Sequence, residues 1–187
     1  MTYSPPSSSS DEGLPSRSLL WRLLREVVET VIPAILIAIF ITLFLAQATQ
    51  VYGQSMEPNL RAGERLIVEK ISYRLHRPQR GDIVVLRLAE QGGNFLIKRV
   101  VGLAEETIEI HDRQLFVDGY PLTEPYVDQS PRGSMPARVI PEGHVFVLGD
   151  NRGFSNDSRS FGPVPLSSVI GRAWIRYWPL AQIGLVH

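Results

Sequence analysis

The sequence predicts a mainly β protein, in which an N-terminal transmembrane helix precedes a β-rich extracytoplasmic domain. Three observations support this. The stretch Thr30–Gln54 contains no charged residue. After Val51, short runs rich in β-branched and aromatic residues alternate with clusters of Gly, Pro, Asn and Asp, which is typical of strands and turns. No segment after Ala48 has the sustained 3.6-residue period of a long amphipathic helix.

The apolar run Val31–Ala48 is the predicted membrane helix. Its eighteen residues would rise about 27 Å, close to the hydrocarbon thickness of a bilayer. Arg17, Arg22 and Arg25 precede the run, and such charges favour the cytoplasmic side. We therefore expect a disordered, cytoplasmic tail over residues 1–29, a single membrane helix over 30–49 and an extracytoplasmic catalytic domain over 50–187.

The first part of the tail, from Met1 to about Ser16, is rich in Ser and Pro and poor in large apolar residues. Such a segment cannot bury enough surface to offset its chain entropy, which is why we expect disorder there. An alternative concerns Ala46-Gln47-Ala48, which has the small-x-small pattern of a leader cleavage site. The chain would then be secreted and begin at Thr49.

The order of strands follows from the runs after Val51. Thr107–Ile110 alternates strictly between polar and apolar residues, and a turn at Asp112–Gln114 leads into Leu115–Val117, which predicts a hairpin. Pro121–Pro141 is rich in Pro, Gly and Ser and predicts a long surface excursion. The other predicted strands are Arg65–Lys70, Ile83–Leu88, Phe95–Val101, His144–Leu148 and Val169–Trp178.

Composition excludes several classes of function. The 187 residues carry a formal net charge of zero, so the basic surface of a nucleic-acid-binding protein is not expected. The chain has no cysteine, which excludes disulfides, a thiol nucleophile and thiolate metal ligands. The four histidines are scattered without the HExxH spacing of a zinc site. We expect no metal and no cofactor.

A serine and a lysine are the candidate catalytic pair. Ser55 follows the apolar run by a short tether, which would limit it to substrates that emerge from the same bilayer. Its hydroxyl is a weak nucleophile until a base removes the proton. Lys98 can be that base only if it is neutral, and burial among apolar side chains lowers a lysine pKa from its reference value of about 10.4.

The predicted strand around Lys98 suits a neutral amine. Side chains alternate along a strand, so Leu96 and Val100 would share the face of Lys98 while Arg99 points away. We therefore expect two aliphatic neighbours and no adjacent carboxylate. A lysine that reaches from a strand edge into solvent remains the structural alternative.

Four blocks of residues stand in order along the chain: Gln54–Pro58 (QSMEP), Arg80–Val85 (RGDIVV), Lys98–Gly102 (KRVVG) and Gly149–Arg159, which begins GDNR and ends DSR. Together they resemble the signal peptidase I family, membrane-anchored Ser/Lys endopeptidases that remove secretory leaders. The resemblance covers about Val51 to Trp174. It implies a β-rich catalytic domain with a smaller β insertion around residues 105–141.

The resemblance also implies roles for individual residues. Ser55 would be the nucleophile and Lys98 the general base. In the loop after Gly149, Ser155 matches a hydroxyl that hydrogen-bonds and orients the lysine, Asp157 and Arg159 match a structural ion pair, and Asp150 and Asn151 match its turn. The implied function is cleavage of exported preproteins after small-x-small sites, so the expected partners are secretory preproteins and the lipid bilayer.

Two positions depart from the family pattern. Many members carry Ser or Thr two residues before the nucleophile, where its hydroxyl stabilises the oxyanion, but this chain has Gly53. The backbone N–H of Ser55 remains a donor for the oxyanion. Phe154 replaces an asparagine that commonly precedes the lysine-orienting serine, which affects the expected hydrogen bonding of that loop.

The resemblance further implies substrate contacts. Candidate wall residues of the small apolar pockets are Val51, Met56, Leu60 and Ile97, although each could equally be ordinary core. An extended substrate would pair with the strand of Ile83 or that of Leu96. Trp174, Tyr177 and Trp178 would either rest on the lipid interface or pack in the core.

Two other functions are compatible with parts of the sequence. A Ser-His-Asp hydrolase would use His144 and Asp150 with Ser55, although the serine lacks the GxSxG elbow. A membrane-tethered β module that binds partners without turnover would explain the departures at Gly53 and Phe154.

Overall fold

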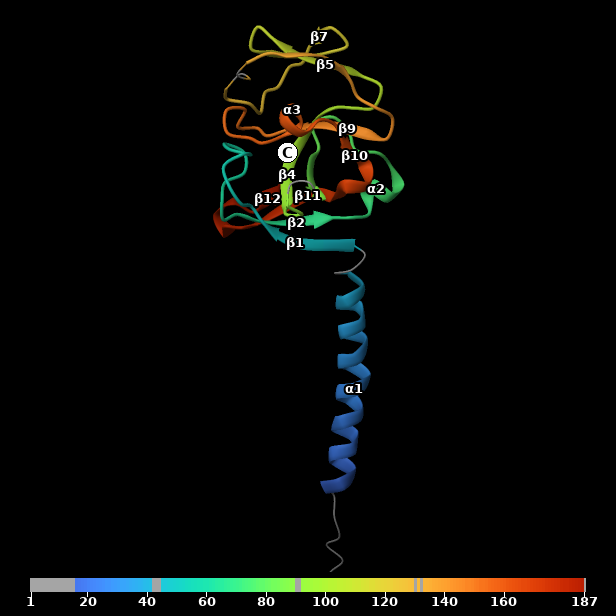
Figure 1. Ribbon diagram of the computed structural model, residues 1–187. Coiled ribbons are helices and arrows are strands. Elements are labelled where there is room, and N and C mark those ends of the chain that lie inside the picture. Colours follow the sequence, from blue (N-terminus) through green and yellow to red (C-terminus); the bar gives the residue numbers. More distant parts are fainter. Residues whose placement is uncertain (1–15, 42–44, 90–91, 130, 132, 187) are drawn as a thin grey trace, which may run out of the picture. The chain divides into compact units, whose positions relative to one another are not determined.

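The computed structural model describes residues 16–41, 45–89, 92–129, 131 and 133–186. The chain divides into two compact units, Met1–Ile41 and Thr42–His187 (Figure 1). Residues 1–15, in which we expected a disordered tail, lie outside the described residues.

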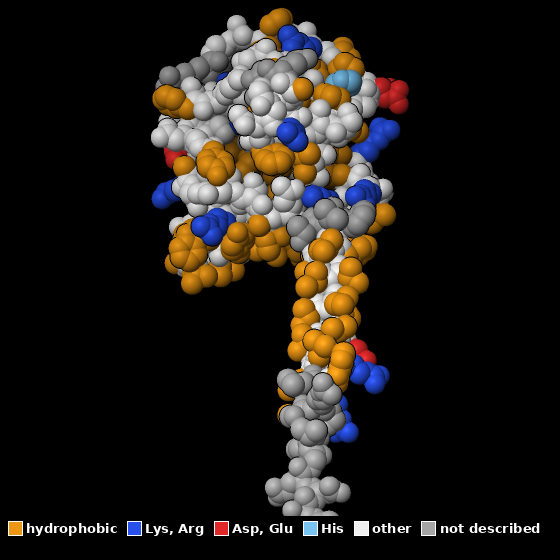
Figure 2. Space-filling view, turned by 60° about the horizontal axis from the view of Figure 1, so that its bottom comes forward, with side chains coloured by type: hydrophobic (Ala, Val, Ile, Leu, Met, Phe, Trp, Pro, Cys, Tyr) orange, Lys and Arg blue, Asp and Glu red, His pale blue; other side chains and the backbone are white. Residues whose placement is uncertain are grey.

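The first unit is the helix α1 (Ser16–Phe40). Leu, Arg and Glu, which favour helices, are frequent in its first half, and Arg25 Nε lies 2.6 Å from Glu29 Oε1, one turn later. The prediction of disorder is therefore wrong for residues 16–29. Hydrophobic side chains cover most of the face of α1 that is visible in Figure 2.

The predicted membrane helix over 30–49 also needs correction. We find no helix in the described ranges with both the length and the apolar character needed to span a membrane. In addition, α1 ends at Phe40, and Ala46–Gln50 form the strand β1. This strand pairs in antiparallel register with β2 (Arg65–Glu69), from Ala46↔Glu69 to Gln50↔Arg65. Ladder pairing satisfies backbone groups that a helix would otherwise bond internally.

The second unit is mainly β, as predicted, and its larger sheet has eight strands among the described residues. Their order is β1-β2-β11-β3-β4-β9-β10, and β12 pairs with β11. Beyond β1 and β2, the bounds are β3 Ile83–Arg87, β4 Phe95–Gly102, β9 His144–Leu148, β10 Val164–Pro165, β11 Val169–Trp178 and β12 Gly184–Leu185. Short helices connect them: α2 Ser72–Leu75, α3 Ser158–Phe161, η3 Leu166–Ser168 and η4 Leu180–Gln182.

A smaller sheet in the order β7-β6-β5-β8 is inserted between β4 and β9. Its strands are β5 Thr107–His111, β6 Gln114–Val117, β7 Tyr120–Pro121 and β8 Met135–Val139. The hairpin of β5 and β6 was predicted, but β8 lies in the segment that we interpreted as a surface excursion. It is an edge strand with four exposed residues, and Pro136 is tolerated there because edge strands need not donate every N–H.

A shared apolar core joins the two sheets (the upper and middle parts of the second unit in Figure 1). Ile108 and Ile140 from the insertion pack with Val101 and Phe146 from the larger sheet. Gly102 lies where they meet, since a Cβ built there would be 2.5 Å from Ile140 Cδ1. The insertion is therefore fixed against β4, the strand that carries Lys98.

Candidate active site

Ser55 lies in the loop after β1, and backbone hydrogen bonds hold this loop at both ends. Val51 N donates to Glu64 O at 2.8 Å, and Gly63 N donates to Val51 O at 3.0 Å. The carbonyl of Ser55 accepts a hydrogen bond from Asn151 N at 3.0 Å. The Ser55 loop is thus joined directly to the loop that follows β9, which we call the 149–159 loop; Asn151 lies 96 residues after Ser55 in the chain.

Lys98 meets Ser55 from the middle of β4. Its Nζ lies 2.8 Å from Ser55 Oγ and 3.0 Å from the carbonyl oxygen of Ile97. The lysine is only 3% exposed, and its strand neighbour Val100 is fully buried. Burial lowers the pKa of Lys98 to about 8, because desolvation penalises the ammonium form. The alternative of a solvated lysine at a strand edge is therefore wrong.

Two carboxylates lie near Lys98, contrary to our expectation, and they act against the lowering of its pKa. Asp157 and Asp150 both raise the pKa of the amine. Each is paired with an arginine: Asp150 with Arg99 at 2.7 and 2.8 Å, and Asp157 with Arg159 at 2.8 Å through both oxygens. Desolvation is the larger effect, so the pKa of Lys98 stays below its usual value.

Ser155 lies beside this pair, but its hydroxyl does not bond Lys98. A Cβ built on Gly149 would be 2.3 Å from Ser155 Oγ and 2.4 Å from the Ser55 carbonyl oxygen, so the two loops touch at Gly149. Ser155 Oγ is buried and has no hydrogen-bond partner among the described residues. The hydrogen bond that we expected between Ser155 and Lys98 is therefore absent among the described residues, and the amine lies within hydrogen-bond distance of Ser55 Oγ and the Ile97 carbonyl oxygen.

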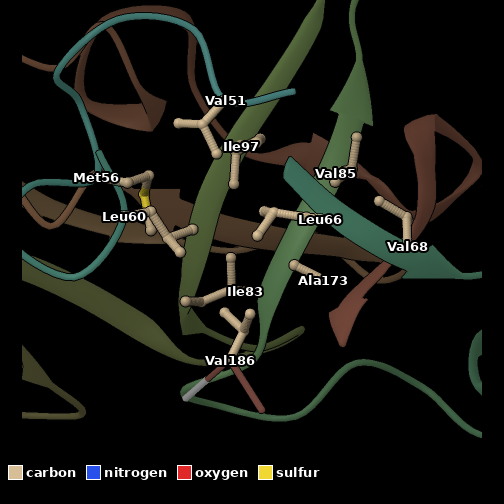
Figure 3. Close-up of a cluster of buried hydrophobic side chains, with 10 residues drawn as sticks. All are labelled: Val51, Met56, Leu60, Leu66, Val68, Ile83, Val85, Ile97, Ala173 and Val186. Carbon is tan, nitrogen blue, oxygen red and sulfur yellow. The ribbon is translucent and has the colours of Figure 1, made fainter. Parts of the chain in front are cut away.

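The four predicted pocket residues come together in one cluster beside Ser55. Figure 3 shows Val51, Met56, Leu60 and Ile97 pointing toward one another. They are 2%, 1%, 2% and 8% exposed, respectively. They are therefore core residues, next to the serine in sequence or in space.

With this geometry in hand, comparison with known families is informative. A sequence model of the family described as "Signal peptidase, peptidase S26" matches residues 24–178. The chain belongs to this signal peptidase family.

Relatives in the family match along most of their length. "Probable signal peptidase I-1" of Synechocystis sp. (strain ATCC 27184) is 39% identical over 171 residues, which cover 88% of this chain and 87% of the relative. "Signal peptidase I" of Leptolyngbya laminosa is 38% identical over 168 residues, with coverages of 86% and 83%. A crystal structure of a signal peptidase I from Enterococcus faecalis V583 shares 34% identity and a TM-score of 0.47, and it covers 52% of this chain and 97% of that chain.

In this signal peptidase family member, β4 has a free edge next to the dyad. Along its length β4 pairs with β3, from Phe95↔Arg87 to Arg99↔Ile83. On the other side, β9 pairs only with Arg99, Val100 and Gly102. In the part of the chain that the structure describes, Phe95–Lys98 therefore has no strand partner on that side. The strand of Ile83 lies between two neighbours and offers no such edge.

The position of Gly53 explains part of its departure from the family pattern. Its φ is 75°, a left-handed conformation that costs side-chain-bearing residues about 1–2 kcal/mol. A Cβ there would meet nothing within 4 Å, so the strain comes from the backbone alone. Phe154 is 66% exposed, and its N–H donates to Asn151 O at 3.1 Å within the turn.

The residues of the Ser-His-Asp alternative do not form a triad. His144 lies at the start of β9, and its Nδ1 is 2.9 Å from the carbonyl oxygen of Glu142. Asp150 lies beyond the end of the same strand, where Arg99 and Asn59 bind its carboxylate. Within the described ranges, no three His, Asp or Glu side chains are grouped so that they could hold a metal ion.

Sequence reasoning missed several residues that support the dyad. Asn59 Nδ2 donates to Asp150 Oδ2 at 2.8 Å and to the carbonyl oxygen of Tyr126 at 2.7 Å. Tyr126 in turn lies over Arg99, with the guanidinium carbon 4.0 Å from the ring centroid. In the sequence, the only signal for a role of Asn59 and Tyr126 was their polar character, because the residues of this network are far apart in sequence and meet only in the folded chain.

Proposed function

We propose that this chain is a serine endopeptidase that removes N-terminal signal peptides from exported preproteins, after small-x-small sites, with Ser55 as nucleophile and Lys98 as general base. Membership of the signal peptidase family supports the reaction. The observation that carries the mechanism is the 2.8 Å separation of Lys98 Nζ and Ser55 Oγ in a buried setting. This geometry favours turnover over a binding module without activity.

The proposed reaction has two halves. Ser55 Oγ attacks the scissile carbonyl carbon while Lys98 Nζ takes the hydroxyl proton. The tetrahedral intermediate then collapses, the C–N bond breaks, and Lys98 returns the proton to the leaving amine. The leader remains as an ester on Ser55, and a water that Lys98 deprotonates hydrolyses it. The Ser55 N–H, which has no hydrogen bond among the described residues, is one candidate donor to the oxyanion.

The substrate is proposed to bind as an added strand along the free edge of Phe95–Lys98. Main-chain hydrogen bonds would hold the leader extended, and its small side chains would face the cluster of Val51, Met56, Leu60 and Ile97. The members of that cluster are at most 8% exposed, so little room is left beside them, which would disfavour large substrate side chains there.

The proposed location is a membrane surface. Two features support it. Exposed apolar side chains line α1, from Val31 at 44% to Phe40 at 54%, and Arg22 and Arg25 lie nearer its start. In the second unit, exposed apolar residues are concentrated near the end of the chain: Trp174, Trp178, Leu180, Ile183 and Leu185.

The decisive experiment compares Ser55→Ala and Lys98→Ala with the unchanged chain in cleavage of a purified preprotein in detergent. Each substitution removes one member of the dyad, so we expect cleavage to fall at least about 10³-fold in both. His144→Ala is the matched control and is expected to cleave normally. Activity that survives in either dyad variant would exclude this mechanism, and collapse in His144→Ala would favour a histidine base.

A further inference from the structure

A segment of the insertion, residues 122–128 after β7, reaches the active site. Glu124 accepts from Arg152 Nη1 at 2.7 Å and from Arg152 Nη2 at 2.6 Å, and the side chains are 8% and 0% exposed. Arg152 Nε donates to the carbonyl oxygen of Gly149 at 3.0 Å. One guanidinium group therefore ties the insertion to the start of the 149–159 loop, next to the contact of Gly149 with Ser55 and Ser155.

Tyr126 provides a second connection, to the strand of the general base. Its ring covers the guanidinium group of Arg99, the residue after Lys98, at 4.0 Å, a distance typical of a cation–π contact. Arg99 Nε and Nη2 bind Asp150, and both side chains are at most 2% exposed. The Tyr126 ring therefore covers one face of the guanidinium group in this buried ion pair.

Tyr126 also contacts the Ser55 loop. Its carbonyl oxygen accepts from Asn59, four residues after Ser55, and the same amide nitrogen reaches Asp150. The phenol donates to Glu124 Oε1 at 2.9 Å. Burial, together with the neighbouring Glu124 carboxylate, raises the pKa of Tyr126, so the phenol stays protonated and remains a donor.

We propose that Glu124 and Tyr126 are positioning residues, through which the inserted sheet holds the Ser55 loop, the Lys98 strand and the 149–159 loop in catalytic register. This proposal rests on the function proposed above. It gives the insertion a part in the reaction, because a segment far from Ser55 in sequence contacts each of the three elements that meet at the dyad. Neither residue touches the reacting atoms, so each acts through Arg152, Arg99 and Asn59.

The test uses the full chain with Tyr126→Leu, which removes the ring over Arg99, and Tyr126→Phe, which keeps the ring and removes only the hydroxyl. We expect Tyr126→Leu to lower kcat about 10- to 100-fold with KM changed less than about 3-fold. We expect the acid limb of the pH–rate profile of this variant to move to higher pH. An Arg99 that is held less firmly would leave more of the Asp150 charge to stabilise the ammonium form of Lys98. Tyr126→Phe should stay close to the unchanged chain.

Tyr120→Leu is the matched control, since Tyr120 lies on β7 of the same insertion and is 77% exposed. Rates are expressed per folded molecule, from the unfolding transition of each variant. If Tyr126→Leu does not fold, Glu124→Gln, which keeps the size and one acceptor of the side chain, takes its place with the same expected fall in kcat. A wild-type kcat and pH profile in the folded variant would overturn the positioning role. Failure of the proposed function is a separate outcome, because it would appear as cleavage of the preprotein that survives in Ser55→Ala.

Discussion

At Lys98, burial and charge act on one amine in opposite directions. Desolvation lowers its pKa, while Asp157 and Asp150 raise it, and the result is a value of about 8. At pH 7 about one tenth of such an amine is neutral, against less than a thousandth at the reference value. The lysine is therefore poised for proton transfer near physiological pH without being fully deprotonated in the resting state.

This value predicts the pH dependence of the reaction. Because the base must be neutral, kcat/KM is expected to rise with pH and to reach half its plateau near pH 8. The measurement is a pH–rate profile on a peptide substrate from about pH 6 to pH 10, with His144→Ala as the control for histidine titration. A midpoint near 6.5, the ordinary value for histidine, that disappears in the control would contradict the assignment of Lys98.

Residue-scale reasoning from sequence paired Ser55 with Lys98, each in a short local motif, and their side chains do lie 2.8 Å apart, while their catalytic roles stay a prediction. The same reasoning failed for the charges around the lysine. Asp150 is 51 residues from Arg99 in sequence and meets it only when β9 pairs with β4. No local pattern could show that the strand of Lys98 would lie between two carboxylates, each paired with an arginine.

At the scale of elements, strands with a buried face were predictable and edge strands were not. β3 has four buried residues in succession and β4 six, and apart from Lys98 and Arg99 these residues are apolar or glycine. β8 and β1 are edge strands with mostly exposed or half-buried residues, and their composition gives little strand signal. Residues 46–49 were assigned to the membrane helix because the apolar run Val31–Ala48 extends into them, whereas pairing with β2 decides their conformation.

The free edge of β4 gives a prediction about the substrate. In an added strand, every second amide points toward its neighbour. We expect N-methylation of alternate residues, among the four before the scissile bond, to raise KM about 5- to 10-fold, since each removes a hydrogen bond worth about 1 kcal/mol. Methylation of the residues between them is the built-in control. Equal sensitivity at all four positions, or at none, would contradict strand addition at Phe95–Lys98.

At the scale of the whole chain, the resemblance placed an insertion around residues 105–141, and the smaller sheet is built from residues 107–139. The four blocks of the family resemblance located the insertion because they flank it on both sides. Its connections to the active site through Glu124 and Tyr126 could not be predicted, since these residues lie outside all four blocks and in a segment that we interpreted as surface.

The exposed apolar residues near the end of the chain give a further prediction. Figure 2 shows hydrophobic side chains gathered along one rim of the second unit. Near the end of the chain, Leu180 of η4 is 67% exposed and Leu185 of β12 is 56% exposed. In the full chain, we expect Trp178→Ser combined with Leu180→Ser to slow cleavage of a preprotein inserted in lipid vesicles about 30-fold. Each side chain should contribute about 1 kcal/mol at the lipid interface.

Cleavage of a short water-soluble peptide by the same double variant should be unchanged. The control pair is Tyr120→Ser with Val139→Ser, two residues of the insertion that are 77% and 63% exposed. Equal slowing on both substrates would indicate damage to the dyad rather than weaker contact with lipid.

The unpaired half of β4 also constrains the shape of any leader that can be cut. Phe95–Lys98 accommodates four extended residues, about 13 Å of chain, whereas the same four residues in a helical leader span only about 6 Å. A leader that is helical within the bilayer must therefore unwind at least one turn before its bond reaches Ser55. Helix-breaking residues a short distance before the bond would make this unwinding easier, so backbone conformation, as well as side-chain size, would decide which bond is hydrolysed.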